Sequence, residues 1–307
     1  MHRALTTAAS SPKALNRQHF QHARYPARVG QSGFTLLELM VGIAIGLMAV
    51  AVAMGALMAS RSVSGTVSDV SQLQQQSAYA FRIIGTQLRH AGSLRLNLAP
   101  LKSSGDAIDA YEGVAFETTV DGFNPTTDTL SGIDNPTGVQ YALTTGFRNY
   151  SEKLYNKSSE ESMLRNCLGQ ENSSTLIQSR FRLNEKTNEL ECAGSGEAQA
   201  LVQNVANFRV RYLRQTEPAP YGDPLIQYVK AADVSNWKEI TAVEICIVMY
   251  GSEIIGTPAS SSSYFDCAGD DGTSKSIDIT TLSAPRTNRI HMVFRNTYQI
   301  RSQGLLG

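Results

Sequence analysis

An uninterrupted apolar run near the N-terminus constrains this chain more than any other feature. It extends from Leu39 to Ala59, twenty-one residues without a charged or strongly polar side chain. As a helix, at ~1.5 Å per residue, the run is ~31 Å long, about the hydrocarbon thickness of a bilayer. We therefore predict a membrane-spanning helix, and we interpret the flanking residues by the side of the membrane on which each would lie.

The residues before the run form a basic leader, 1–33. It contains five Lys and Arg residues and no acid. The positive-inside rule retains such a segment in the cytoplasm and sends the residues after the run across the membrane. Without the leader, 22 basic residues remain beside 27 acidic ones, a net charge of −5. This acidic remainder argues against nucleic acid as a directly bound ligand, because phosphate recognition relies on clustered Lys and Arg.

A single carboxylate, Glu38, directly precedes the run. A cleaved secretory signal has an apolar core of roughly 7–15 residues, shorter than this one, and a plain signal anchor does not explain the acid. A charge is costly in lipid, so it usually marks a partner or a function. The alternative is that Glu38 lies at headgroup level on the first helical turn, favoured by the helix dipole.

Residues 31–41, QSGFTLLELMV, resemble the class III signal sequence of type IV pilins and type II secretion pseudopilins. The motif has Gly before the cut, Phe at the new first position and Glu at the fifth. The resemblance implies that a prepilin peptidase cleaves between Gly33 and Phe34 and N-methylates Phe34. It also implies that Glu38 pairs with the positive terminus of a neighbouring subunit, as a buried charge requires. The leader is longer than is usual in that family.

The helix is expected to continue beyond the membrane as an amphipathic segment. Apolar positions at three-and-four spacing define its expected buried face. These positions are Val63, Val67, Val70, Ser77, Phe81, Ile84 and Leu88. His90-Ala91-Gly92 is a stop sequence with Gly at the C′ position. We therefore expect residues 34–60 as a transmembrane and polymerisation helix and 61–92 as the amphipathic half of the same helix.

Residues 93–307 contain short β-like runs separated by Gly, Pro, Asn and Asp. This pattern predicts an α+β fold, in which the C-terminal half of the long helix packs on an antiparallel β-sheet head with loop-rich insertions. The expected strands are Val114–Val120, Gly138–Thr144, Arg180–Leu183 with Glu189–Cys192, Val205–Leu213, Ile240–Tyr250 and Arg289–Ile300. The polar regions 97–135, 150–176 and 252–286 are expected to be loops.

The four cysteines, Cys167, Cys192, Cys246 and Cys267, all lie in this head region. An even number behind an export segment favours disulfides, although four cysteines allow three connectivities. Proximity in the sequence favours Cys167 with Cys192 and Cys246 with Cys267. Each bridge would contribute roughly 3 kcal/mol in the chain-entropy model. Zinc is disfavoured because the chain has no C-x-x-C pair and no histidine near these cysteines.

Three segments of the head resemble, in order, the minor pilins of the PilW type: 201–212, 237–245 and 289–301. The resemblance implies a type IV pilin-like fold and a minor subunit that joins other minor pilins, primes pilus assembly and lies near the tip. It would support twitching motility, adhesion or DNA uptake. Implied partners are the prepilin peptidase, other minor and major pilins and the inner-membrane assembly platform.

The resemblance also implies a location. Before assembly the chain lies in the inner membrane, with a cytoplasmic N-terminus and a periplasmic head, and afterwards in the surface pilus. Two alternatives remain open at this point. One is a minor pseudopilin of a type II secretion system, which shares the N-terminal chemistry. The other is a membrane-anchored periplasmic binding module or adhesin.

No catalytic constellation is apparent in the sequence. Only His90 and His291 follow the leader, and no G-x-S-x-G, P-loop or H-E-x-x-H motif occurs. We therefore expect no enzyme activity, no cofactor and no metal. Four acids surround Cys267, namely Asp266, Asp270, Asp271 and Asp278. Their spacing does not match an EF-hand, so we interpret them as a solvated loop rather than a calcium site. Trp237 is interpreted as a core residue at a strand edge rather than a ligand platform.

Overall fold

The computed structural model describes residues 33–94, 96–97, 115–116, 122–156, 158–171, 173–216, 223, 225–255, 262–269 and 271–300. The chain divides into two compact units, 1–56 and 57–307. A single helix, α1 (Leu36–His90), contributes residues to both. Nearly all of the leader lies outside the described residues.

The helix α1 ends where the sequence predicts. Gly92 adopts a left-handed backbone conformation with φ of 68°, and glycine does so without the steric cost that a Cβ would bring. The Ser93 N–H donates to the His90 carbonyl at 2.9 Å, and the Gly92 N–H donates to the Gly146 carbonyl at 2.9 Å. The second bond ties the end of the helix to a strand of the head.

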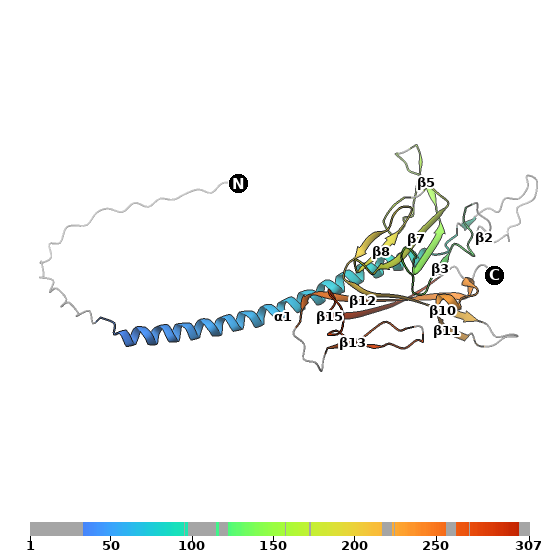
Figure 1. The fold of residues 1–307 in the computed structure, drawn as a ribbon. Coiled ribbons are helices and arrows are strands. Elements are labelled where there is room, and N and C mark those ends of the chain that lie inside the picture. The colour runs from blue at the N-terminus through green and yellow to red at the C-terminus, as the bar shows by residue number, and fades with distance from the viewer. Residues whose placement is uncertain are drawn as a thin grey trace, which may run out of the picture. The chain divides into compact units, whose positions relative to one another are not determined.

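The strands form two main antiparallel sheets, visible in Figure 1. The first sheet has the order β3-β4-β7-β8-β9. Its strands are β3 (Leu130–Gly132), β4 (Leu143–Arg148), β7 (Leu176–Asn184), β8 (Glu189–Ala193) and β9 (Gln199–Val202). The second sheet has the order β11-β10-β12-β15. Its strands are β11 (Leu225–Val229), β10 (Val205–Thr216), β12 (Ile240–Ile254) and β15 (Arg289–Gln299).

Three further strand pairs are also antiparallel. They are β1 (Leu96–Asn97) with β2 (Ala115–Phe116), β5 (Ser151–Lys153) with β6 (Glu160–Ser162), and β13 (Ser263–Phe265) with β14 (Ser276–Asp278). The predicted α+β class is confirmed, with two main sheets in the head where one was expected.

The long strands of the head were predicted well and the short ones were not. The expected strands at 205–213, 240–250 and 289–300 correspond to β10, β12 and β15, and the β7–β8 hairpin lies where it was expected. The expected strand Gly138–Thr144 is wrong, because β4 begins only at Leu143. Gly138 has a φ of 61°, and the Gln140 N–H donates to the Thr137 carbonyl at 3.1 Å, so this stretch is a turn.

Several short strands lie in regions that were expected to be loops, or where no element was expected. These are β3, β5, β6, β9, β11, β13 and β14. Each has five or fewer residues, too few for an alternating pattern to stand out in the sequence. Of the expected strand Val114–Val120, only β2 lies within the described residues.

One face of the second half of α1 is buried in the head. It consists of Leu73, Ser77, Ala80, Ile84 and Leu88, each at most 3% exposed. These positions are three or four residues apart, so they form one continuous stripe. The expected face was correct for Ser77, Ile84 and Leu88.

The expected face was wrong at its N-terminal end. Val63 and Val67 are 65% and 64% exposed, whereas Asp69 is 4% exposed. Among the described residues of α1, full burial begins only at Asp69. The helical spacing of apolar residues therefore begins at Val63, whereas the buried face of the helix begins at Asp69.

The buried stripe of α1 belongs to a core that both sheets share. Figure 1 shows β7 and β8 of the first sheet and β12 and β15 of the second sheet near this half of α1. A row of paired residues crosses the second sheet, since Val243 lies opposite Tyr212 on one side and Tyr298 on the other. The core also includes Leu143, Phe181 and Leu190 from the first sheet and Ile245 and Ile247 from the second.

At Gly85, α1 lies in close contact with Tyr298 of the second sheet. A methyl group at Gly85 would collide with the ring of Tyr298, whose hydroxyl donates to the Phe81 carbonyl at 2.8 Å and so holds the ring in place. We expect Gly85→Ala to lower the free energy of unfolding by roughly 2 kcal/mol. Overpacking costs about 1–3 kcal/mol, which exceeds the ~1 kcal/mol that Ala gains over Gly in a helix.

Urea denaturation of the full chain in detergent measures this loss. The control is Gly85→Ala combined with Tyr298→Leu, which should recover part of the stability because the smaller side chain leaves room for the methyl group. A Gly85→Ala variant as stable as the wild type would contradict the close approach.

Candidate functional site

The N-terminal end of α1 is closed by a reciprocal pair, Thr35 and Glu38. The N–H and Oγ1 of Thr35 both donate to Glu38 Oε2 at 3.0 Å, and the Glu38 N–H donates to Thr35 Oγ1 at 3.3 Å. This is a capping box, in which each side chain satisfies a backbone N–H that the helix leaves unpaired. The T-x-x-E spacing of Thr35 and Glu38 is the sequence signal for this box, a role for Glu38 beyond those expected from the signal motif.

Two residues precede the capping box and lie outside the helix. Gly33 and Phe34 are exposed, and the Phe34 side chain is 89% exposed. The structure therefore brings Gly33, Phe34 and Glu38, the residues named from the signal motif, into one short N-terminal segment. Glu38 acts within its own chain there, and its carboxylate in the first helical turn also complements the helix dipole.

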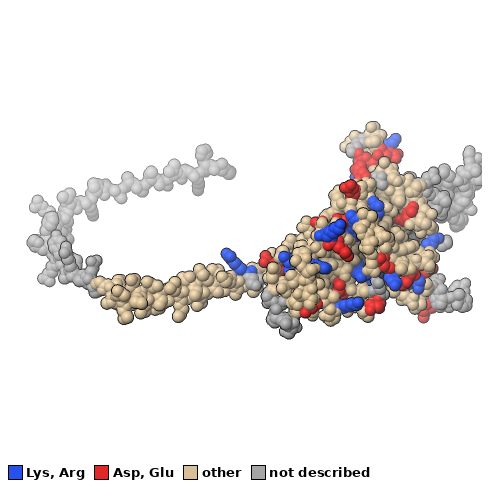
Figure 2. Space-filling model, in the orientation of Figure 1, with Lys and Arg blue, Asp and Glu red and all other residues tan. Residues whose placement is uncertain are grey.

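The part of α1 that follows the capping box is apolar and exposed on all sides. Leu47, Met48 and Met58 are between 65% and 71% exposed. Figure 2 shows a long stretch of the helix in tan, without the blue or red of charged side chains. In the sequence, no Asp, Glu, Lys or Arg lies between Glu38 and Arg61. Among the described residues, α1 is the one helix long and apolar enough to cross a membrane. Such a surface requires lipid or other apolar helices to cover it.

Asp69 ties α1 to the end of β12. The Ser252 hydroxyl donates to Asp69 Oδ1 at 2.6 Å, and the Glu253 N–H donates to Asp69 Oδ2 at 2.8 Å. Arg289 on β15 donates to the carbonyls of Gly251 and Ser252 and so fixes the same strand end. Sequence reasoning missed this contact because an acid in an amphipathic helix is normally assigned to the solvent face.

The protonation of Asp69 follows from the same contacts. Burial by itself raises the pKa of this carboxyl group. The hydrogen bonds from Ser252 and Glu253 and the charge of Arg289 outweigh burial, so the pKa of Asp69 lies below its ordinary value. The ionised carboxylate is therefore the form that holds β12 to the helix.

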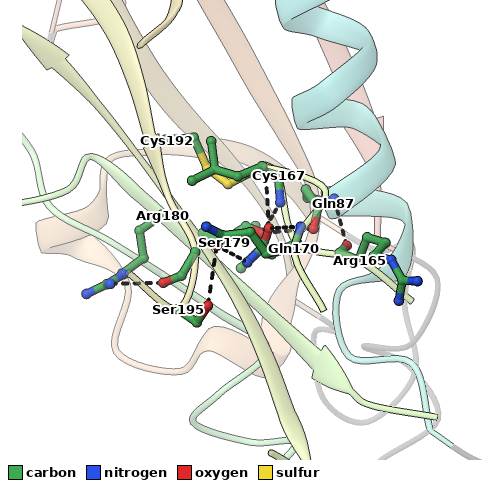
Figure 3. Close-up of a disulfide and its surroundings, with 12 residues drawn as sticks. Gln87, Arg165, Cys167, Gln170, Ser179, Arg180, Cys192 and Ser195 are labelled. Atoms are coloured by element: carbon green, nitrogen blue, oxygen red, sulfur yellow. Dashed lines mark hydrogen bonds between the residues drawn. A yellow bond between two sulfur atoms is a disulfide. The ribbon is translucent and has the colours of Figure 1, made fainter. Parts of the chain in front are cut away.

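The first disulfide joins Cys167 to Cys192 on β8 and lies beside a chain of buried hydrogen bonds, shown in Figure 3. The Cys167 N–H donates to Ser179 Oγ at 3.0 Å, and the Ser179 hydroxyl donates to Gln87 Oε1 at 2.8 Å. Gln87 in turn donates from Nε2 to the Arg165 carbonyl at 3.3 Å. The chain links α1, β7 and the cysteine loop, and it satisfies polar groups that burial would otherwise penalise.

The second disulfide joins Cys246 on β12 to Cys267. It holds the excursion that contains β13 and β14 on the second sheet, in a small apolar cluster with Val248, Tyr264 and Val293. The two pairs in the structure are the two that sequence proximity favoured.

The acids around Cys267 have separate local roles. Asp266 accepts from the Asn207 side chain at 2.9 Å and from the Cys267 N–H at 2.7 Å. Thr273 and Thr280 donate to Asp271 and Asp278 and hold the pKa of each acid below its ordinary value. Asp270 lies outside the described residues. Within the described part of the chain, no group of three or more His, Cys, Asp and Glu residues could hold a metal ion.

The two histidines that follow the leader make aromatic contacts. The His291 ring stacks on Tyr264 with the centroids 4.6 Å apart, and the His90 ring meets Phe147 edge-on at 5.4 Å. Burial lowers the pKa of both histidines. Neutral imidazoles packed on aromatic rings contribute to the packing of the head.

Trp237 lies in a short 3₁₀ turn, η2 (Trp237–Glu239), just before β12. Its ring meets Tyr212 edge-on with the centroids 5.0 Å apart. The expected core role fits this contact, although Trp237 precedes the strand rather than lying on it.

Known protein families match this chain in its N-terminal and its C-terminal parts. Residues 168–302 match the family of type IV pilus-assembly protein W, and residues 28–54 match the prokaryotic N-terminal methylation motif. No curated protein matches the chain. Among solved structures, the type IV-like pilin TTHA1219 from Thermus thermophilus is 13% identical, with 51% of this chain and 76% of that chain covered and a TM-score of 0.25.

Asp69→Asn tests the tie between α1 and β12. An amide offers one acceptor oxygen to two donors, so we expect the free energy of unfolding at pH 7 to fall by about 1–3 kcal/mol. Because the pKa in the folded protein lies below the ordinary ~3.9, the carboxylate's contribution is complete above about pH 4 and is lost as the pH falls through the lowered pKa.

Urea denaturation of both proteins at several pH values measures the difference. The difference should stay constant from about pH 8 to about pH 5 and shrink below about pH 4. Glu197→Gln, at an exposed position, is the matched control and should leave stability unchanged. An equal loss at every pH would contradict the role assigned to the ionised carboxylate.

Proposed function

This chain is a type IV prepilin of the PilW type, and from that premise we propose that it is a minor pilin that helps to prime pilus assembly. The observation that carries the proposal is the exposed, charge-free apolar surface that follows Glu38 on α1. A helix of this kind is stable in a bilayer or packed among similar helices, and a filament core supplies the second environment.

Processing is the first step of the proposal. A prepilin peptidase cleaves between Gly33 and Phe34 and then N-methylates the new terminus at Phe34. Both residues are exposed and precede the first helical turn, so the bond to be cut lies in non-helical chain that an enzyme can reach. The basic leader 1–33 keeps this bond on the cytoplasmic face.

Assembly is the second step. Glu38 is the sole charged residue between positions 34 and 60. In the proposed filament its carboxylate pairs with the positive terminus of a neighbouring subunit, because a charge among packed apolar helices needs an opposite charge. Residues 34–60 serve as the polymerisation helix, 61–92 as its head-bound half and 93–307 as the periplasmic head.

The remaining steps concern location and partners. The subunit waits in the inner membrane, meets the assembly platform there and joins other minor and major pilins near the tip of the pilus. Its head acts by surface contact rather than catalysis, in support of twitching motility, adhesion or DNA uptake. A minor pseudopilin shares the N-terminal chemistry, and loss of pili rather than of secretion in a deletion strain separates the two.

Glu38→Gln tests the pairing role. Glutamine at this position preserves a capping box with Thr35 but removes the charge. We expect cleavage and methylation to continue, while the amount of the subunit in sheared filaments falls by ~10-fold or more, because an unpaired buried charge on the neighbour is costly. Immunoblots of filament and membrane fractions measure the amount.

The matched control is Thr35→Val, which weakens the capping box and leaves the carboxylate. It should enter filaments much as the wild type does. Mass spectrometry of the mature N-terminus follows processing in all three proteins. A Glu38→Gln protein that enters filaments normally would overturn the pairing role, and an uncut leader would overturn the prepilin assignment.

A further inference from the structure

A groove of about 640 Å³ lies between α1 and β15. One wall comes from residues 77–89 of α1 and the other from residues 293–298 of β15. The two elements run in the same direction, because Asp69 and Ile290 both adjoin Gly251, and Tyr298 adjoins Gly85 further along the helix. Figure 1 shows β15 beside this half of α1. The groove is therefore long and narrow, a shape suited to an extended ligand.

The edge of β15 beside this groove is open. The second sheet ends at β15, and none of the described strands pairs with its outer edge. The Ile300 N–H donates to the Thr241 carbonyl at 2.8 Å, and the pairing with β12 continues without a bulge from Gln299 to His291. Residues of even number in β15 therefore bond to β12, whereas residues of odd number direct their N–H and C=O groups to the open edge.

This edge lacks the usual protection against another strand. Proteins protect open edges with proline, bulges or charged side chains that point along the edge. The stretch from His291 to Gln299 has no proline and no bulge. Its one charged side chain, Arg295, donates to the Asp266 carbonyl at 3.2 Å and to Ser274 Oγ at 2.8 Å. Arg295 is therefore held on the face that carries the β13–β14 excursion, and it does not block the edge.

The two elements that form the groove contain arginines and no acid. α1 has no Asp or Glu after Asp69, and β15 has none along its whole length. Four arginines lie in the same two segments. Two of them, Arg82 and Arg89, are exposed and line the groove. They are seven residues apart, so they lie on one face of the helix, two turns from each other.

No acid compensates the charges of Arg82 and Arg89. Within the described part of the chain, neither side chain forms an ion pair. Their contacts are with their own helix, since Arg82 lies 5.8 Å from the centre of the Tyr79 ring and Arg89 donates to Thr86 Oγ1 at 3.5 Å. On a chain whose exported part has a net charge of −5, two such arginines in one groove indicate an acidic ligand.

The chemistry of the groove favours an acidic polypeptide over two other occupants. The half-buried rings of Phe81 and Phe294 add apolar surface to the lining. A strand with apolar and acidic residues matches the rings, the arginines and the open edge, whereas a nucleic acid matches the arginines alone. A second copy of β15 at this edge would place the arginines of two chains together, and like charges at such a pairing are destabilising.

We propose that this groove binds an extended, acidic segment of a partner protein, which adds as an antiparallel strand beside β15. Backbone hydrogen bonds to the open edge supply affinity, and Arg82 and Arg89 select acidic side chains on the face toward α1. The inference holds whether or not the chain enters a filament, so its failure and that of the proposed function are separate results.

The probe is a fluorescent heptapeptide of alternating valine and glutamate with blocked ends. Fluorescence anisotropy measures its binding to the full chain in detergent micelles. We expect saturable binding that weakens ~10-fold or more in the double variant Arg82→Glu with Arg89→Glu. The matched control, Lys153→Glu with Lys186→Glu, reverses two exposed charges outside the groove and should leave the affinity unchanged.

Two N-methylated peptides test strand addition itself. In an antiparallel strand beside β15, residues that bond to the odd-numbered positions have side chains on the face away from α1. The glutamates face α1, so the valine amides make the hydrogen bonds. Methylation of the valine amides should therefore abolish binding, and methylation of the glutamate amides should preserve it. Equal binding of both peptides, or the reverse preference, would overturn antiparallel strand addition.

Four other outcomes would also overturn the proposal. The first two are no binding by the unmodified peptide and equal binding of a valine–lysine heptapeptide. The third is binding of a short single-stranded oligonucleotide at least as tight as that of the peptide. The fourth is self-association that the Arg82 and Arg89 variant abolishes, which would assign the groove to a second copy of this chain. Circular dichroism of each variant confirms that the head remains folded.

Discussion

The burial of one face of α1 against both sheets is the contact on which the head depends. Ile84 and Leu88 have no exposed surface, and they belong to the same core as Phe181 of the first sheet and Ile245 of the second. Each sheet alone would leave an apolar face in water, and the helix stripe covers part of both. The helix therefore joins the two sheets, together with the direct contact of Tyr212 on β10 with the Ala142 carbonyl.

Polar contacts fix the position of the helix within that core. Asp69 holds the end of β12, and Gln87 reaches Ser179 on β7 beside the first disulfide. Apolar packing is not directional, whereas buried hydrogen bonds are costly to break when no other partner can replace them. These two contacts therefore set the register of α1 relative to each sheet, one near the start of the buried stripe and one near its end.

The same helix carries a second, different surface. Its first half is apolar on all sides and exposed, and its N-terminal turn is closed by Thr35 and Glu38. The capping box gives Glu38 a role in the single chain that does not conflict with a later partner. A carboxylate can accept several hydrogen bonds, so Thr35 and an incoming positive group can both be accommodated. The capping box keeps the carboxylate ordered within the single chain.

The sequence by itself determined the features that depend on local composition. These include the apolar helix after the Gly33–Phe34 motif, the glycine stop at Gly92 and the long strands β10, β12 and β15. The sequence favoured the two disulfide pairs among three possible connectivities, and the structure has those pairs. Only the tertiary structure decided which part of the amphipathic helix is buried, that the head has two main sheets, and that β11 pairs with the second half of β10. Val63 and Asp69 show why: the spacing of apolar residues reports what a helix can bury, but distant strands decide where burial begins.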